Sequence, residues 1–246
     1  MKYQANKGQV FYGHTIGILM LDSFVPMIPG DVGNATSYTY PVLYQTLKGI
    51  TTKKMVARDS DVLPEIISKS KELISDGAKA ITGDCGFLLM YQNELRQALN
   101  VPTFLSSLLQ LPFMLHMLNQ EEKVGIITAD STLLDTSLLH KIGINPNRLL
   151  ITGLETYHHF YHSCLGESGT LDSTKVEQEV VQAAKHLVKQ DDNVKAILLE
   201  CSFLPPYVSI IISSPRSTVK KVTFLTSFFI TSSKALSIKL PIIIDN

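Results

Sequence analysis

The sequence predicts an α/β fold with parallel β-sheets, built from two duplicated halves. Short aliphatic segments bounded by glycine, proline or charge alternate with segments of helical periodicity, as in βαβ units. Two motifs recur in the same order: KAITGDCGFL (79–88) returns as KAILLECSFL (195–204), and TIGILMLDS (15–23) returns as KVGIITADS (123–131). The offsets, 116 and 108 residues, are so similar that duplication explains them better than chance likeness between buried strands.

Composition limits the classes of protein to consider. The 246 residues suffice for one large domain or two small lobes, and the formal net charge of zero does not favour nucleic acid or an anionic membrane as a partner. The N-terminus lacks the apolar core of a signal peptide, and no apolar stretch approaches the ~20 residues of a membrane helix. Three cysteines without a Cys-x-x-Cys pair predict free thiols, a cytoplasmic location and no zinc site.

The expected strands are short, aliphatic and fully buried, as in parallel sheets. They are residues 16–21 (IGILML), 79–83 (KAITG), 101–107 (VPTFLSS), 124–129 (VGIITA), 148–153 (RLLITG) and 195–200 (KAILLE). The expected helices are residues 61–77, 91–100 and 172–190. In the first of these, Val62, Ile66 and Leu73 recur at helical spacing, and Gly77 is a stop signal.

Cys85 and Cys201 each follow an expected strand directly. Sites in open parallel sheets form outside the carboxyl ends of the strands, so two facing halves would place both thiols in one cleft. Each thiol is also expected at the start of a helix, where backbone N–H groups should lower its pKa from about 8.5 toward neutrality. Gly83 and Gly86 leave room for a ligand to approach the backbone. Two opposed thiols suit a carbon acid that loses a proton on one face and regains it on the other.

Two other groups of side chains receive less functional weight. Cys164 lacks the strand-end setting and is interpreted as an ordinary buried cysteine. Asp84 and Glu200, which precede the two cysteines, are interpreted first as solvated or capping groups.

Two further motifs could bind metal or cap a helix. His158 and His162 have a spacing that can bind metal on a helix, but no third ligand is evident, so no metal site is predicted. For Asp130, a helix cap and a role in the site are equally favoured.

Five segments together resemble the aspartate/glutamate racemase superfamily, which includes hydantoin racemase, arylmalonate decarboxylase and maleate isomerase. They are GILMLDSFVPMIPGDVGNATSYTYPV, ITGDCGFL, VPTFLSSLLQLP, VGIITADS and LLECSFLPPY. The resemblance implies two Rossmann-like lobes related by a pseudo-twofold axis, an active site in the interlobe cleft and no cofactor. The implied lobes are residues 1–108 plus 208–246, and residues 109–207.

The resemblance also implies roles for individual residues. Cys85 and Cys201 match the acid/base pair. The residues expected to bind the substrate are Asp22, Ser23, Asn34, Thr36, Thr82, Gly86 and Ser202. The expected partner is a small-molecule carboxylate substrate, with no nucleic acid and no membrane, and a homodimer is the candidate assembly.

The sequence departs from the family pattern at two places. Ser202 keeps the hydroxyl that usually follows the second cysteine, but Phe203 replaces the polar residue after it. The segment 208–238 is rich in serine and threonine, and it favours a pair of strands over the helix that the family has there.

These observations predict a cofactor-independent racemase of an acidic amino acid, an isomerase of amino acid metabolism that uses a two-cysteine acid/base mechanism. Two alternatives stay open. One is another reaction of the superfamily, decarboxylation or cis–trans isomerisation through a single cysteine. The other is a small-molecule-binding relic without turnover.

Overall fold

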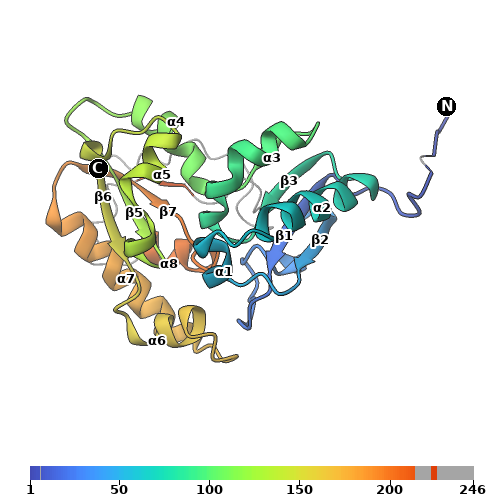
Figure 1. Ribbon diagram of the computed structural model, residues 1–246. Coiled ribbons are helices and arrows are strands. Elements are labelled where there is room, and N and C mark those ends of the chain that lie inside the picture. Colours follow the sequence, from blue (N-terminus) through green and yellow to red (C-terminus); the bar gives the residue numbers. More distant parts are fainter. Residues whose placement is uncertain (6, 214–222, 226–246) are drawn as a thin grey trace.

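The protein folds into two α/β lobes, each built on a parallel sheet, which confirms the predicted fold class (Figure 1). The computed structural model describes residues 1–5, 7–213 and 223–225. The strand order is β2-β1-β3-β4 in the first sheet and β6-β5-β7-β8 in the second. Both sheets therefore have the same order relative to their own first strand, as expected of halves related by a pseudo-twofold axis.

Eight strands and eight α-helices are described. The strands are β1 (Ile16–Leu21), β2 (Val42–Leu47), β3 (Ala80–Gly83), β4 (Thr103–Phe104), β5 (Lys123–Thr128), β6 (Leu149–Gly153), β7 (Val194–Leu199) and β8 (Thr223–Leu225). The helices are α1 (Thr52–Ala57), α2 (Val62–Ser75), α3 (Gln92–Ala98), α4 (Leu111–His116), α5 (Thr136–Lys141), α6 (His158–Phe160), α7 (Ser173–Gln190) and α8 (Val208–Ser213). Three short elements near the cysteines are the 3-10 helices η2 (Gly86–Tyr91) and η3 (Ser107–Gln110) and the π-helix η6 (Tyr161–Leu165).

Each sheet has a glycine in its central strand, under the helix that covers the sheet. A Cβ on Gly17 of β1 would lie 3.1 Å from Leu73 Cβ of α2. A Cβ on Gly125 of β5 would lie 2.6 Å from Leu187 Cδ2 of α7. The glycines at the start of the two repeated strand motifs are therefore places where helix and sheet approach closely.

The structure differs from the expected elements at three places. Strand β2 was not expected, because its residues are mostly half-buried at the sheet edge and do not form an aliphatic run. The expected strand 101–107 shrinks to the two residues of β4. The helix expected after Cys85 begins as η2, a 3-10 helix, and becomes α-helical only at Gln92.

The lobe boundaries stay a prediction. Residues 208–246 were expected to join the first lobe, but most of them lie outside the described residues. Of the parts that are described, α8 packs on α7, and β8 pairs with β7 in the second sheet. Within the segment 208–238, which was expected to favour strands, the described residues thus form the short helix α8 and the strand β8.

The largest core cluster is shared by the two lobes. It contains Leu19 and Ile81 of the first sheet together with Val124 and Leu198 of the second. A separate cluster fills the space between the second sheet and α7. The shared core fixes the lobes against each other, so the carboxyl ends of β3 and β7 are held in a defined relation.

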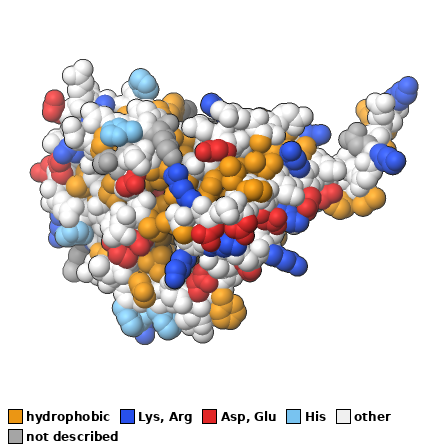
Figure 2. Space-filling model, in the orientation of Figure 1, with side chains coloured by type: hydrophobic (Ala, Val, Ile, Leu, Met, Phe, Trp, Pro, Cys, Tyr) orange, Lys and Arg blue, Asp and Glu red, His pale blue; other side chains and the backbone are white. Residues whose placement is uncertain are grey.

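The surface carries no large field of one charge on the face shown in Figure 2, where acidic and basic side chains are interspersed. The first residues of the chain project away from the two lobes (Figures 1 and 2). Among the described helices, none is both long and apolar enough to cross a bilayer.

The substitution Gly125→Ala should destabilise the protein by about 1–3 kcal/mol, because its methyl group would overpack against Leu187. Urea unfolding of Gly125→Ala, Leu187→Ala and the double variant would measure the coupling between the two positions. Leu187→Ala makes room for the new methyl group, so the double variant should lose less stability than the two single losses added together. Strictly additive losses would contradict the proposed contact between strand and helix.

Candidate active site

Both strand-end cysteines line one cavity between the lobes, with a volume of about 60 Å³. From the first lobe, its wall includes Ser23, Cys85 and Gly86. From the second lobe, it includes Cys201 and Ser202. Five of the residues that the sequence assigned to the site thus line this cavity.

Cys85 is half-buried and lies two residues after the end of β3, before the first turn of η2. Burial raises the pKa of the thiol well above its usual range, against a smaller lowering effect from the backbone N–H groups of Phe87 and Leu88. The nearby carboxyl groups of Asp84 and Glu200 raise it further.

Cys201 is buried and follows β7 at the equivalent point of the second lobe. Burial and the adjacent Glu200 raise its pKa well above the usual range, against the lowering effect of one backbone N–H, that of Phe203. No long helix begins here, since turns separate Cys201 from α8.

The expected fall of both thiol pKa values toward neutrality is therefore wrong. A 3-10 turn after one cysteine and irregular turns after the other supply too few N–H groups to offset burial. Two buried carboxyl groups, which the sequence interpretation placed in solvent, act in the same direction as burial.

The carboxyl groups of Asp84 and Glu200 are buried, with exposed fractions of 5% and 2%, so the interpretation as solvated groups is also wrong. The backbone N–H of Leu21, in β1, donates to both oxygens of Asp84 at 3.1 and 3.0 Å. Thr128 Oγ1, in β5, donates to Glu200 Oε2 at 2.8 Å. Each carboxyl group therefore bonds to the end of the central strand of its own sheet. Burial raises the pKa of each to about 7.

Two contacts bring the cysteine segments of the two lobes together. A Cβ on Gly86 would collide with Glu200 Oε1 and would lie 2.9 Å from the Glu200 carbonyl oxygen, so only glycine allows this approach. Ser107 of η3 donates a hydrogen bond to the carbonyl oxygen of Leu199 at 3.0 Å. The residues next to Cys85 and Cys201 are thus in direct contact across the lobe boundary.

Four residues expected to bind the substrate do not line this cavity. The Asp22 carboxylate accepts a hydrogen bond from Gly49 N–H at 2.8 Å, and Thr82 Oγ1 donates to the Phe104 carbonyl at 2.7 Å. Asn34 caps a short 3-10 turn, and its Oδ1 accepts hydrogen bonds from Thr36 N–H and from the Thr36 hydroxyl. These contacts give all four residues a structural role.

The cavity also contains residues that the sequence interpretation missed. Cys164, left as an ordinary cysteine, lines the cavity from the π-helix η6. Burial raises its pKa to about 12. Glu167 follows this helix with a φ of 47°, an unusual backbone conformation for a residue other than glycine. π-Helical turns and positive φ angles often mark functional sites, but neither can be read from this sequence.

The histidine pair was considered as a metal site, and Asp130 was considered as a helix cap or a site residue. The rings of His158 and His162 stack 6.4 Å apart, and within the described part of the chain no group of three or more potential ligands could hold a metal ion. Asp130 is a cap, because its side chain accepts a hydrogen bond from Thr132 N–H at 2.9 Å.

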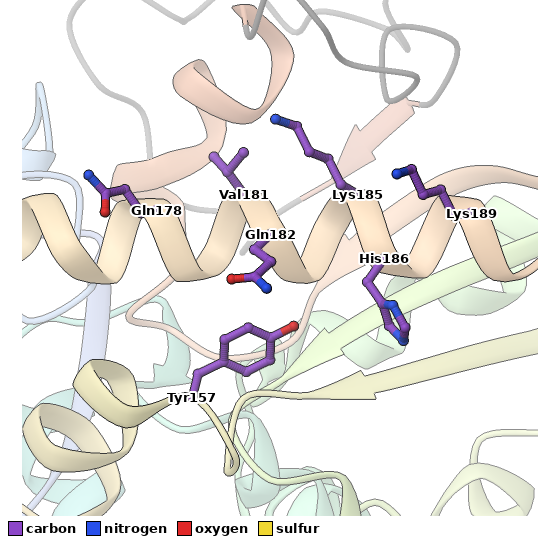
Figure 3. A pocket seen from close by; sticks show the side chains of 7 residues that line it. All are labelled: Tyr157, Gln178, Val181, Gln182, Lys185, His186 and Lys189. Carbon is purple, nitrogen blue, oxygen red and sulfur yellow. The ribbon is translucent and has the colours of Figure 1, made fainter.

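A larger hollow, about 730 Å³ in volume, lies along α7 and is separate from the cysteines (Figure 3). Gln182 and His186 project toward Tyr157, whereas Lys185 and Lys189 project from another side of the helix. Its described lining residues offer amide, imidazole and ammonium groups on the surface of one helix, and none is a thiol or a carboxylate. The small interlobe cavity is therefore the better candidate for an active site.

Solved structures with the same arrangement of lobes identify the fold. A glutamate racemase from Bacillus anthracis matches with a TM-score of 0.56 and 16% identity, over 90% of this chain and 79% of that chain. An arylmalonate decarboxylase matches with a TM-score of 0.53 and 15% identity, over 86% of this chain and 87% of that chain. The chain has the aspartate/glutamate racemase superfamily fold. The resemblance to this superfamily inferred from the motifs is confirmed.

Curated relatives of the chain are named as lyases and not as the expected racemase. The chain is 29% identical over 226 residues to a dimethylsulfoniopropionate lyase from Durusdinium sp. clade D, covering 88% of this chain and 74% of the relative. It is 31% identical over 216 residues to dimethylsulfoniopropionate lyase 6 from Emiliania huxleyi, covering 83% of this chain and 56% of the relative. The chain thus spans little more than half the length of the second relative. No protein-family model matches the chain.

The expected function is therefore corrected. An amino-acid racemase, an isomerase of amino acid metabolism, conflicts with relatives that are named as lyases. The error has a physical origin. Reactions that begin by removing a proton beside a carboxylate can share the same thiols, and the cysteine pair does not reveal how the resulting carbanion reacts.

Stability should fall as the pH rises from about 4 to 7. Asp84 and Glu200 have folded-state pKa values of about 7 against ordinary values of 3.8 and 4.5, so between these values the folded state binds more protons than the unfolded state. Asp84→Asn keeps an acceptor for Leu21 N–H but removes one titration. It should flatten the decline by up to about 1.4 kcal/mol per pH unit.

Urea unfolding at a series of pH values would test this prediction. The matched control is Glu121→Gln, which removes a carboxylate from an exposed position and should leave the slope unchanged. A wild-type protein that gains stability as the pH rises from 4 to 7, or an Asp84→Asn variant with the wild-type slope, would contradict the assigned burial.

Proposed function

We propose that this protein is a lyase that cleaves dimethylsulfoniopropionate, or a close β-sulfonium carboxylate, by elimination. The observation that carries the proposal is the convergence of Cys85 and Cys201 on one cavity, in a chain whose relatives are named as lyases of this compound. The proposal lies closest to the alternative in which one cysteine performs another reaction of the superfamily.

The proposed reaction needs one base. The thiolate of Cys85 or Cys201 takes a proton from C2, the carbon next to the carboxylate. The electron pair forms a C2–C3 double bond as the C3–S bond breaks, and the products are acrylate and neutral dimethyl sulfide. The leaving group departs without a proton, so a second group is not required as an acid. Positioned acid/base groups typically contribute ~10²–10⁴-fold to such proton transfers.

A cationic substrate would also promote ionisation of the thiols. Burial and nearby carboxyl groups hold the pKa of both cysteines well above the usual range. An opposite charge within ~4–6 Å favours the charged form of a titratable group. A sulfonium group bound beside the thiols would therefore stabilise the thiolate at the moment when a base is needed.

The charge of the cavity fits a sulfonium compound better than an acidic amino acid. The described residues that line it include three carboxyl groups, Asp84, Glu167 and Glu200, and no lysine, arginine or histidine. A dicarboxylic amino acid would bring further negative charge to this wall. The hydroxyl groups of Ser23, Thr52 and Ser202 remain as donors for the single carboxylate of the substrate.

Phe203, the residue that departs from the family pattern, supports the same conclusion. It lines the cavity together with Phe87, so two aromatic side chains accompany the carboxyl groups. Aromatic faces attract cations with about 0.5–2 kcal/mol, and they would also favour the methyl groups of a sulfonium. A polar partner for an amino group is not needed in this site.

The purified protein should release dimethyl sulfide from dimethylsulfoniopropionate, with an equal amount of acrylate. Headspace gas chromatography and proton NMR would measure the two products. Cys85→Ala and Cys201→Ala identify the base: loss of at least one thiol should lower kcat by ~10²-fold or more. The activity should rise with pH, because the raised thiol pKa values leave little thiolate at neutral pH.

A matched control is Cys85→Ser or Cys201→Ser, which keeps the size and the hydrogen bonds but not the acidity of a thiol. The unfolding midpoint of each variant shows whether the fold is intact. Products formed by both alanine variants at the wild-type rate would exclude the thiols as the base. A wild-type protein that leaves the C–S bond intact would contradict the proposed function.

A further inference from the structure

One oxygen of Glu200 has no partner although it is buried in the wall of the cavity. Oε2 accepts the hydrogen bond from Thr128, but Oε1 lacks any hydrogen-bond partner among the described residues. The residue is only 2% exposed, and it lines the same cavity as both cysteines. A buried acceptor without a partner is unfavourable, and more so if it is charged, so this oxygen is a candidate for a contact with a ligand group.

Glu200 Oε1 lies close to the segments that carry both cysteines. Oε1 lies against the backbone of Gly86, the residue after Cys85, and Glu200 itself precedes Cys201. A group that contacts Oε1 would therefore lie between the two strand ends that carry the cysteines. The groups that interact electrostatically here are Asp84 and Cys85 from the first lobe and Cys201 from the second.

The equivalent residue of the first lobe does not offer such an oxygen. Both oxygens of Asp84 accept a hydrogen bond from Leu21 N–H. Glu200 has one more methylene group, and its Oε1 extends beyond its own sheet to the segment of the other lobe. The duplication thus supplies two buried carboxyl groups, of which one has an oxygen without a hydrogen-bond partner among the described residues.

The ligand that suits this oxygen is a cation. A hydroxyl or amine donor could also satisfy it, but the carboxyl groups of the cavity have no basic side chain among the described lining residues to balance them. We propose that Glu200 selects the substrate of this cleft by contacting its positively charged onium group, a sulfonium or a quaternary ammonium, through Oε1. The second feature of the ligand is a carboxylate, separated from the onium atom by two carbons. This feature is taken from the proposed function, so the assignment rests on that function.

The contact would also align the reacting atoms. In a β-onium carboxylate, the charged atom is bonded to C3, and C2 is the next carbon. An onium group at Glu200 Oε1 therefore holds C2 close to the strand ends, where the thiols lie. The contact with Glu200 would then both recognise the charge of the substrate and place the C2 proton near the thiols. Glu200 itself does not take the proton.

A pair of ligands of equal shape tests the contact by binding alone. They are 3-(trimethylammonio)propanoate and 4,4-dimethylpentanoate, which differ only in a charged nitrogen or a neutral carbon at the quaternary centre. Isothermal titration calorimetry on the wild-type protein should show about tenfold or greater preference for the cation, the size expected of one charged contact. NMR before and after the titration confirms that both ligands remain intact.

Variants assign the preference to Glu200. Glu200→Gln should reduce the ratio of the two dissociation constants to about one, mainly by weakening the binding of the cation. Glu200→Asp keeps the charge and should keep part of the preference. The control is Glu121→Gln, which removes an exposed carboxyl group that does not line the cavity, so the preference should stay at the wild-type value.

The pH gives a second test that does not depend on the Glu200→Gln variant. Burial raises the pKa of Glu200 to about 7, so the carboxyl group is increasingly neutral below that pH. The wild-type preference for the cation should therefore shrink between pH 8 and pH 5, whereas the affinity for the neutral ligand should change less. Burial also raises the pKa of Asp84, in the same cavity, to about 7, so the pH series is repeated on Asp84→Asn, where the shrinkage should persist if Glu200 carries it.

The outcomes separate this assignment from the proposed function. Equal affinity of the wild-type protein for the two ligands, including no binding of either, would overturn it. A folded Glu200→Gln variant that keeps the full preference would do the same. A protein that prefers the cation through Glu200 but releases no dimethyl sulfide would keep the assignment and lose the proposed lyase activity.

Discussion

The bond between each buried carboxyl group and the central strand of its sheet is the interaction that positions the cleft. Asp84 and Glu200 stand at the last position before the cysteines, and their partners Leu21 and Thr128 are at the ends of β1 and β5. Burying a carboxyl group is costly unless it is hydrogen-bonded or neutral. The two bonds therefore fix where β3 and β7 end and hold Cys85 and Cys201 at that place.

The same carboxyl groups determine the electrostatics of the cavity. Together with burial they raise the pKa of both thiols, and they provide negative charge for a cationic ligand. A positively charged substrate would pair with a buried carboxylate, and it would also favour ionisation of the thiols. A negatively charged substrate would repel the carboxylates and would disfavour ionisation of the thiols. The local charge thus discriminates between reactions that the cysteines alone leave open.

The sequence predicted the parts of this molecule that depend on periodicity and repetition. Aliphatic runs indicated the buried strands, and the repeated Cys85 and Cys201 motifs indicated the duplicated lobes and their common cleft. Sequence reasoning failed where the structure depends on contacts distant in sequence. Nothing near Glu200 in the chain shows that its partner is Thr128, and nothing near Cys164 shows that η6 brings it to the cavity. Burial of Asp84 also could not be read from a polar residue beside a strand.

Removal of the C2 proton by a thiol of the cleft is the central claim, and a deuterium label tests it most directly. Single-turnover rates would be compared for dimethylsulfoniopropionate carrying deuterium at C2 or at C3, with the thiols analysed by mass spectrometry afterwards. Elimination predicts a slower reaction with deuterium at C2, a much smaller effect at C3 and unmodified cysteines. Equal rates with both labels, together with a methyl or carboxyethyl group on Cys85 or Cys201, would show that the thiol attacks carbon and would contradict the account.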